Sequence, residues 1–205
     1  MQIYGSLQSR GKVDELTGPS PGNMYALTHL MCESLLEMLW SSSRLNSTVL
    51  RLANGFGPPT FPSSSFSWLA MNDFCRSAVQ DGVILLKSDG AALRDFIFVE
   101  DVCRAVELAA VNCALGSNVY NVASSHTISI LEAAHLVADL CSKLTGSPVE
   151  VRVPSGLPEN LAPTSEGRFH VMSGKILREA GFAATVSLGE GVRRTLQYYL
   201  SKEGA

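Results

Sequence analysis

Between residues 24 and 40 the apolar side chains recur every three or four positions, which is the spacing of one face of a helix. The apolar positions are Leu27, Leu30, Met31, Leu35, Met38 and Leu39. Gly and Pro lie just upstream of this stretch and a Ser-rich run lies just downstream, so both ends carry residues that stop a helix. The pattern predicts an amphipathic helix over residues 24–40.

Shorter apolar runs between turn residues predict strands. Residues 47–52 form a β-branched and aliphatic run that ends in the turn cluster of residues 54–59, where Gly and Pro prevent the strand from continuing. Further strands are expected at residues 1–5, 83–86, 118–122 and 149–153, and further helices at 66–80, 102–112, 130–144, 174–180 and 192–200. Because strands and helices alternate, the sequence predicts an α/β protein with mainly parallel strands.

Composition narrows the functional classes. With 46% hydrophobic and 17% charged residues the chain is able to bury an ordinary globular core, and its net charge of −3 is too small to favour nucleic-acid or acidic-membrane partners. The five cysteines are scattered without a C-x-x-C pair, which favours reduced thiols and a cytoplasmic location. No apolar run approaches the roughly 20 residues of a membrane span, and the residues after Met1 do not form a signal sequence. The histidines are isolated from other ligands, so no metal site is expected.

Five short motifs follow one another in a specific order. They are Tyr4-Gly5, Tyr25-x-x-x-His29, Arg51-Leu-Ala-Asn54-x-x-Gly57-Pro58, Asp89-Gly90-x-x-x-Arg94-Asp95-Phe-x-x-Val99-x-Asp101 and Tyr120-Asn121-Val122. In this order the chain resembles the C-terminal part of the NAD-dependent epimerase/dehydratase family, the extended short-chain dehydrogenases/reductases. The resemblance implies a partial Rossmann-like parallel sheet, with its last strands only, and a small C-terminal α/β substrate-binding lobe. Residues 1–54 and 96–124 would be the remnant of the Rossmann-like domain, and residues 55–95 and 125–205 the sugar-nucleotide-binding lobe.

The resemblance gives Tyr25 and His29 catalytic and cofactor-binding roles. In the family a Tyr-x-x-x-Lys pair moves a proton on a sugar hydroxyl while the nicotinamide cofactor takes or returns a hydride. Positions i and i+4 lie on one helix face, so both side chains are able to reach the same ribose and substrate oxygen. His29 replaces the lysine here, and an imidazole, mostly neutral at pH 7, favours the phenolate less than a permanent charge does. Alternatively, the two are ordinary helix residues.

Three further residues have expected binding roles by the same resemblance. Ala53 would lie beside the nicotinamide and Asn54 would offer its amide to a phosphate oxygen of the substrate, although Asn is also simply a good turn residue. Arg94 resembles the family arginine that binds a diphosphate oxygen, for which its fork of donors is suited. The alternative for Arg94 is a structural ion pair with Asp95 or Asp101. Asp101 itself is expected in the first turn of a helix, where the helix dipole favours a carboxylate.

The glycine-rich turn that holds a dinucleotide pyrophosphate does not occur in these 205 residues. The function that the resemblance implies is that of an NAD- or NADP-dependent epimerase, dehydratase or reductase acting on a nucleotide sugar. Without this turn it would be incomplete as it stands, with the missing N-terminal half or a second copy as partner. A non-catalytic, truncated relic that keeps only the substrate-binding lobe is the alternative. An unrelated α/β binding module would require the order of the five motifs to be a coincidence.

Overall fold

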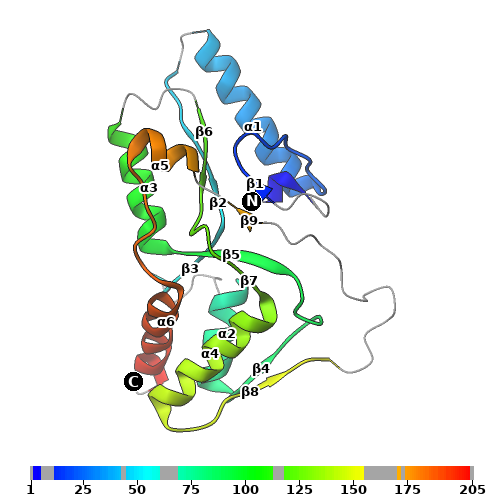
Figure 1. The fold of residues 1–205 in the computed structure, drawn as a ribbon, viewed down its shortest axis with the longest axis vertical. Helices are drawn as coiled ribbons and strands as arrows, with labels where there is room; N and C mark the ends of the chain where they lie inside the picture. Colours follow the sequence, from blue (N-terminus) through cyan, green and yellow to red (C-terminus); the bar gives the residue numbers. More distant parts are fainter. Residues whose placement is uncertain are drawn as a thin grey trace. The chain divides into compact units, whose positions relative to one another are not determined.

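The structure is a computed structural model that describes residues 2–5, 12–42, 45–60, 69–112, 118–154, 170–171 and 174–203. The chain forms two compact units, each built from three stretches of sequence. The first unit comprises Met1–Gly55, Asp95–Thr127 and Ser165–Thr185, and the second comprises Phe56–Arg94, Ile128–Thr164 and Val186–Ala205. Figure 1 shows the elements of both.

A pair of parallel strands forms the centre of the first unit. Strand β2 (Val49–Leu52) pairs with β6 (Val119–Val122), and Val49 lies opposite Val119. The strands run side by side in Figure 1, with α3 (Val99–Val111) and α5 (Gly174–Ala180) drawn beside them. The core of this unit consists of Ala53, Ile97, Ala105, Tyr120, Val122, Ala123, Ile176 and Phe182. The α/β class and the two strands expected from the sequence are confirmed.

The beginning of the chain differs from the sequence expectation. Residues 1–5 were expected to end a strand, but the described part of this segment is a 3-10 helix, η1 (Gln2–Tyr4). The chain turns at Gly5, whose φ of 61° is favourable only for glycine. A Cβ at Gly5 would lie 1.9 Å from the carbonyl oxygen of Ser20, so the close approach of two backbones also requires glycine. Beside η1, β1 (Lys12–Val13) pairs in parallel with β9 (His170–Val171).

Helix α1 (Met24–Ser41) forms where the periodicity predicts it, and the Asn23 side chain caps it by accepting a hydrogen bond from the amide of Ala26 at 2.8 Å. Its packing differs from the expectation of one buried apolar face. Ala26 is the only buried residue among those of the helix, whereas Met24, Met31 and Met38 are 72, 62 and 60% exposed. Apolar side chains occur around most of this helix, and a helix of that composition is typical of a position covered on several sides.

Three helices and a strand pair form the second unit. Helices α2 (Ala70–Gln80), α4 (Ile130–Thr145) and α6 (Leu188–Glu203) pack against one another, and β4 (Val83–Leu85) pairs in parallel with β8 (Glu150–Arg152). Helix α4 begins with a capping box between Ser129 and Glu132. It ends at Gly146, which has a φ of 74°. The first residues of the expected helix 66–80, numbers 66–68, lie outside the described residues.

Several strands lie outside the ranges predicted from the sequence, among them β1 and β9. Residues 54–56, expected to be part of a turn, form strand β3 (Asn54–Phe56), which with β5 (Leu93–Phe98) and β7 (Thr127–Ser129) makes a sheet of order β3-β5-β7. Pairing with a distant strand outweighs the local turn preference of Asn and Gly. The turn itself begins at Gly57.

The described residues of the stretch 165–185 belong to the first compact unit, while the assignment of residues 125–205 to a sugar-nucleotide-binding lobe stays a prediction. Among the described residues of this stretch, α5 packs on β6, and Ile176 and Phe182 are part of the first unit's core. The Asp101 carboxylate also accepts a hydrogen bond from the amide of Thr185 at 3.1 Å. Within the described ranges, no helix is both long enough and apolar enough to cross a membrane.

Candidate functional site

The structure brings Tyr25 and His29 together on the first two turns of α1. Their ring centroids lie 4.4 Å apart with the planes tilted by 53°. Tyr25 is 62% exposed and His29 is also exposed, so the phenol and the imidazole both face out of the described part of the first unit. The i, i+4 spacing therefore produces the shared face that the sequence predicts.

A buried ion pair attaches α1 to strand β2. The Arg51 guanidinium donates two hydrogen bonds to Glu33, from Nε to Oε1 at 3.0 Å and from Nη2 to Oε2 at 2.7 Å. The two side chains are only 8 and 13% exposed. Arg51 is part of one of the five sequence motifs, but no role was expected for it. The available signal was a charged residue in the middle of a strand otherwise made of Val and Leu.

Tyr4 extends this network to β6. Arg51 Nη1 donates to the Tyr4 hydroxyl at 2.8 Å, and that hydroxyl donates to Oδ1 of Asn121 at 2.7 Å. Burial raises the pKa of Tyr4, although the hydrogen bonds with Arg51 and Asn121 oppose the shift. Burial by itself would lower the pKa of Arg51, but its bonds to Glu33 and Tyr4 outweigh burial and raise that pKa overall. Arg51 is therefore a permanent charge and Tyr4 a neutral donor, and together they fix η1, α1, β2 and β6 to one another.

Ala53 and Asn54 follow β2 directly. Ala53 is 7% exposed, and its amide donates to the carbonyl of Val122 at 2.9 Å. The Asn54 side chain has a partner within the protein, because its Nδ2 donates to the backbone carbonyl of Asp95 at 2.9 Å. Asn54 thus braces the β3–β5 connection, and one N–H of its amide is already used.

Asp95 is a buried carboxylate beside this brace, 1% exposed. Its Oδ1 accepts a hydrogen bond from the amide of Ser124 at 2.9 Å, while its Oδ2 is buried without a partner. Burial raises the pKa of Asp95 to about 6, against the opposing hydrogen bonds from residues 124–126. Within that segment Ser125 has a φ of 61°, a backbone conformation that is unfavourable for a residue with a side chain. The contact with Asp95 helps to hold this conformation.

Arg94, in the second unit, is half-buried, and its Nη1 donates to the carbonyl of Leu93 at 2.8 Å. Of the two ion-pair partners considered for Arg94, Asp101 pairs with Arg104 at 2.6 Å. Asp101 lies in the first turn of α3, as expected, and is completely buried.

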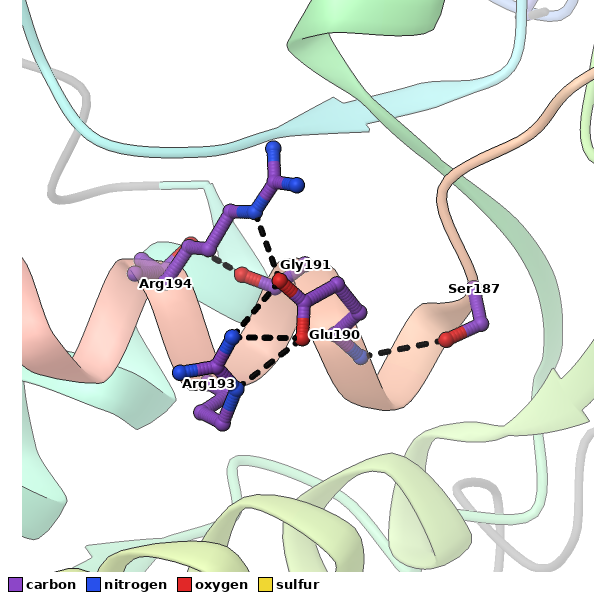
Figure 2. A network of polar contacts seen from close by, with 6 residues as sticks. Ser187, Glu190, Gly191, Arg193 and Arg194 are labelled. Carbon is purple, nitrogen blue, oxygen red and sulfur yellow. Dashed lines mark hydrogen bonds and ion pairs between the residues drawn. The ribbon is translucent and has the colours of Figure 1, made fainter.

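Arg193 and Arg194 in the first turns of α6 are a further pair of cations in the second unit. Figure 2 shows that both approach Glu190, with Nε of Arg193 at 2.9 Å and Nε of Arg194 at 2.7 Å from its carboxylate oxygens. The Ser187 hydroxyl accepts from the Glu190 amide at 3.3 Å and caps the helix. Because one carboxylate already binds both guanidinium groups, we assign them to the stability of α6.

Comparison with known proteins tests the resemblance directly. The sequence model of the NAD dependent epimerase/dehydratase family matches residues 1–123. The chain belongs to this family. The match includes the motifs from Tyr4 to Tyr120, so the family assignment made from the order of the motifs is confirmed.

Curated relatives extend the similarity to almost the whole chain. A dTDP-glucose 4,6-dehydratase of Neisseria gonorrhoeae is 26% identical over 211 residues, which is 98% of this chain and 58% of that protein. The enzyme of the same name from Streptomyces griseus is 27% identical over 97% of this chain and 56% of its own length. The chain thus spans little more than half the length of the curated relatives it matches.

Solved structures confirm the fold class. An epimerase of Methanothermobacter thermautotrophicus superposes with a TM-score of 0.80 at 22% identity, covering 99% of this chain and 57% of that one. The RMD protein of Pseudomonas aeruginosa, solved in complex with NADPH, has a TM-score of 0.76 at 22% identity over 98% of this chain and 64% of that one. At this level of identity the likeness shows the fold alone: that of an epimerase/dehydratase, of which this chain has a part.

Proposed function

We propose that this chain is the sugar-nucleotide-facing part of an NAD- or NADP-dependent epimerase, dehydratase or reductase acting on a nucleotide sugar. The observation that carries the proposal is the Tyr25–His29 pair on one exposed face of α1, in a chain whose motifs match the family. Its relatives include proteins named for their action on dTDP-glucose, and similar folds have been solved with NAD or NADPH. In this proposal the first unit is the remnant of the Rossmann-like domain and the second is the sugar-nucleotide-binding lobe.

Tyr25 is the proposed acid/base. Its phenolate would take a proton from a sugar hydroxyl, or its phenol would return one, and a nicotinamide cofactor, when bound, would accept and return the hydride. His29, whose ring centroid lies 4.4 Å from that of Tyr25, would donate to or accept from the ribose of the cofactor and keeps the phenol ring in place. The ion pair between Glu33 and Arg51 attaches α1, which carries Tyr25 and His29, to β2.

The residues present fit one end of such a cofactor. The exposed Tyr25 and His29 side chains offer polar groups to the nicotinamide ribose, and Ala53 at the end of β2 has a side chain small enough to lie beside the nicotinamide. The glycine-rich pyrophosphate turn is not in the sequence, so the proposal requires it from another segment or chain. The exposed apolar side chains of α1 are consistent with such a covering partner, either an N-terminal half or a second copy.

Asn54 and Arg94 are the proposed substrate-binding residues. Asn54 keeps one amide N–H for a phosphate oxygen after its bond to Asp95, since a primary amide carries two. Arg94 donates to the carbonyl of Leu93, and its planar fork of N–H donors is of the kind that suits a diphosphate.

Binding and turnover measurements test the proposal. Calorimetry with dTDP-glucose and with UDP-glucuronic acid is expected to show binding by the purified chain, and added NAD is expected to be reduced only when a segment with the glycine-rich turn is supplied. Replacing Tyr25 by Phe is expected to keep sugar binding and to lower hydride transfer by roughly a hundredfold or more. The matched control is Tyr198→Phe, on α6, which should leave both unchanged.

The outcomes separate the alternatives. Nucleotide-sugar binding without any binding of millimolar NAD(H), even with the glycine-rich segment supplied, would favour the non-catalytic lobe. Full hydride transfer by the Tyr25→Phe variant would remove Tyr25 from the reaction. No binding of either nucleotide sugar would refute the proposed substrate class.

A further inference from the structure

Asn72, in the first turn of α2, is a buried polar residue that belongs to none of the five sequence motifs. It is 1% exposed. A primary amide in this position must find hydrogen-bonding partners within the protein, because an unpaired buried amide destabilises the fold. Its partners show what the residue does.

Both ends of the Asn72 amide bind the same residue, Gly57. The Gly57 amide donates to Asn72 Oδ1 at 3.2 Å, and Asn72 Nδ2 donates to the Gly57 carbonyl at 2.8 Å. The planar amide of Asn72 thus offers one donor and one acceptor, as the backbone of a neighbouring strand does in a β-sheet. The side chain of Asn72 therefore acts as a strand partner for a single residue.

The chain needs such a partner at this point. Strand β3 ends at Phe56, and Pro58 and Pro59 have no amide hydrogen with which to continue a backbone ladder. Gly57 has a φ of 153° and is buried, so its own N–H and carbonyl require partners that the next residues do not supply. Asn72 supplies both.

Helix α6 holds the Asn72 side chain in turn. Its side chain hydrogen-bonds the hydroxyl of Tyr199 on α6, and α2 packs on α6. The position of Gly57 is thus set by two helices of the second unit, not by the loop's own residues.

We propose that Asn72 is a positioning residue for nucleotide-sugar binding: by holding Gly57 it presets the loop that follows β3, beginning Gly57-Pro58, in its ligand-binding conformation. The inference rests on the proposed function, because it assumes that this loop meets the nucleotide sugar. A preset loop loses less conformational freedom when the ligand binds, so affinity is higher than for a mobile one. Asn72 does not touch the ligand in this scheme.

Two measurements on the full chain test the inference. Hydrogen exchange of the Gly57 amide is measured without ligand, and dTDP-glucose and UDP-glucuronic acid are titrated by calorimetry. Asn72→Ala removes both bonds to Gly57, whereas Asn72→Asp keeps the acceptor for the Gly57 amide and loses the donor. The matched control is Thr195→Val, which removes another buried hydrogen bond of the second unit, from Thr195 Oγ1 to the Gly191 carbonyl at 2.8 Å.

For Asn72→Ala we expect the exchange rate of the Gly57 amide to rise by about tenfold or more relative to any rise in the exchange rates of the α2 amides. We expect the dissociation constant for the nucleotide sugar to rise by a similar factor. Asn72→Asp should fall between this variant and the natural chain, and it replaces Asn72→Ala if that variant does not fold. Thr195→Val should change neither quantity. Gly57 exchange that rises no more than that of α2, or affinity that is unchanged while Gly57 exchange rises, would overturn the inference. If the natural chain binds neither nucleotide sugar, the proposed function and its Asn72 role fail together, whereas unchanged affinity in the variants refutes the role of Asn72 alone.

Discussion

Replacing Glu33 by Gln is a sharp test of how α1 is held in place. The substitution keeps the size of the side chain but removes the negative charge opposite Arg51. A glutamine has one carbonyl oxygen, so it can accept only one of the two bonds that Glu33 accepts at 3.0 and 2.7 Å, and its NH₂ group meets the other guanidinium N–H. Arg51 would then be a buried cation without a counter-ion.

The magnitude follows from burial. A bond to a charged group contributes about 1.5–3 kcal/mol, and breaking a buried ion pair by removing one partner costs about 3–5 kcal/mol. Because the Glu33 and Arg51 side chains keep 13 and 8% exposure, some solvent screening remains, and we expect the lower end, roughly 3 kcal/mol. That loss lowers the folded-to-unfolded ratio by roughly a hundredfold.

Urea unfolding followed by circular dichroism measures this loss. The control is Glu150→Gln, which breaks the pair with Arg152, whose two side chains are each 59% exposed, and should give no resolvable change. A second variant, Arg51→Met with Glu33→Met, should recover much of the loss, since no charge is then left buried. If Glu33→Gln is as harmless as Glu150→Gln, the ion pair does not hold α1 on β2.

Three other changes test separate parts of the structure. Because the pKa of Asp95 is raised to about 6, the folded protein holds this proton more tightly than the unfolded chain does, and the group makes stability fall as pH rises from about 4 to about 6. As pH rises from 4 to 7, the free energy of unfolding of Asp95→Asn, measured in urea, should therefore increase by roughly 2 kcal/mol relative to that of the natural chain, and parallel pH profiles would contradict this. Gly90→Ala places a Cβ 2.8 Å from Cβ of Leu131 at a φ of 75°, whereas Gly82→Ala places its Cβ in open space at a similar φ of 64°. In thermal unfolding the Gly90 variant should therefore be less stable than the Gly82 variant by roughly 1–3 kcal/mol, and equal stabilities would refute the packing argument. Ser129→Ala removes the cap of α4 and should cost about 1 kcal/mol, measured by urea unfolding, unless the capping box contributes nothing.

Local signals in the sequence were sufficient for the main helices and for the family. Helix α4 has both an apolar period and capping residues at its ends, and α1 has a period and an Asn cap, so each is specified by residues within a few positions of one another. Strands β2 and β6 are short apolar runs between turn residues. The order of the five motifs, which the family match over residues 1–123 confirms, is also a property of the linear chain.

The contacts of the site depended on residues far apart in the sequence. Nothing local to Arg51 shows that it pairs with Glu33, 18 positions earlier, and nothing local to Asn72 shows that it binds Gly57, 15 positions earlier. For the same reason β3 was taken for a turn, since the strand that pairs with it begins at Leu93.

The sequence by itself determined the α/β class, the principal helices and the family of this protein, because apolar period, capping and motif order act over short distances. Only the tertiary structure decided which faces are covered, which charges are buried and which loop is held by which helix. Apolar side chains along α1 did not reveal that so many would be exposed, because burial depends on which other segments pack against the helix. Hydrogen-bond partners are likewise chosen by the fold, which brings distant donors and acceptors within reach of one another.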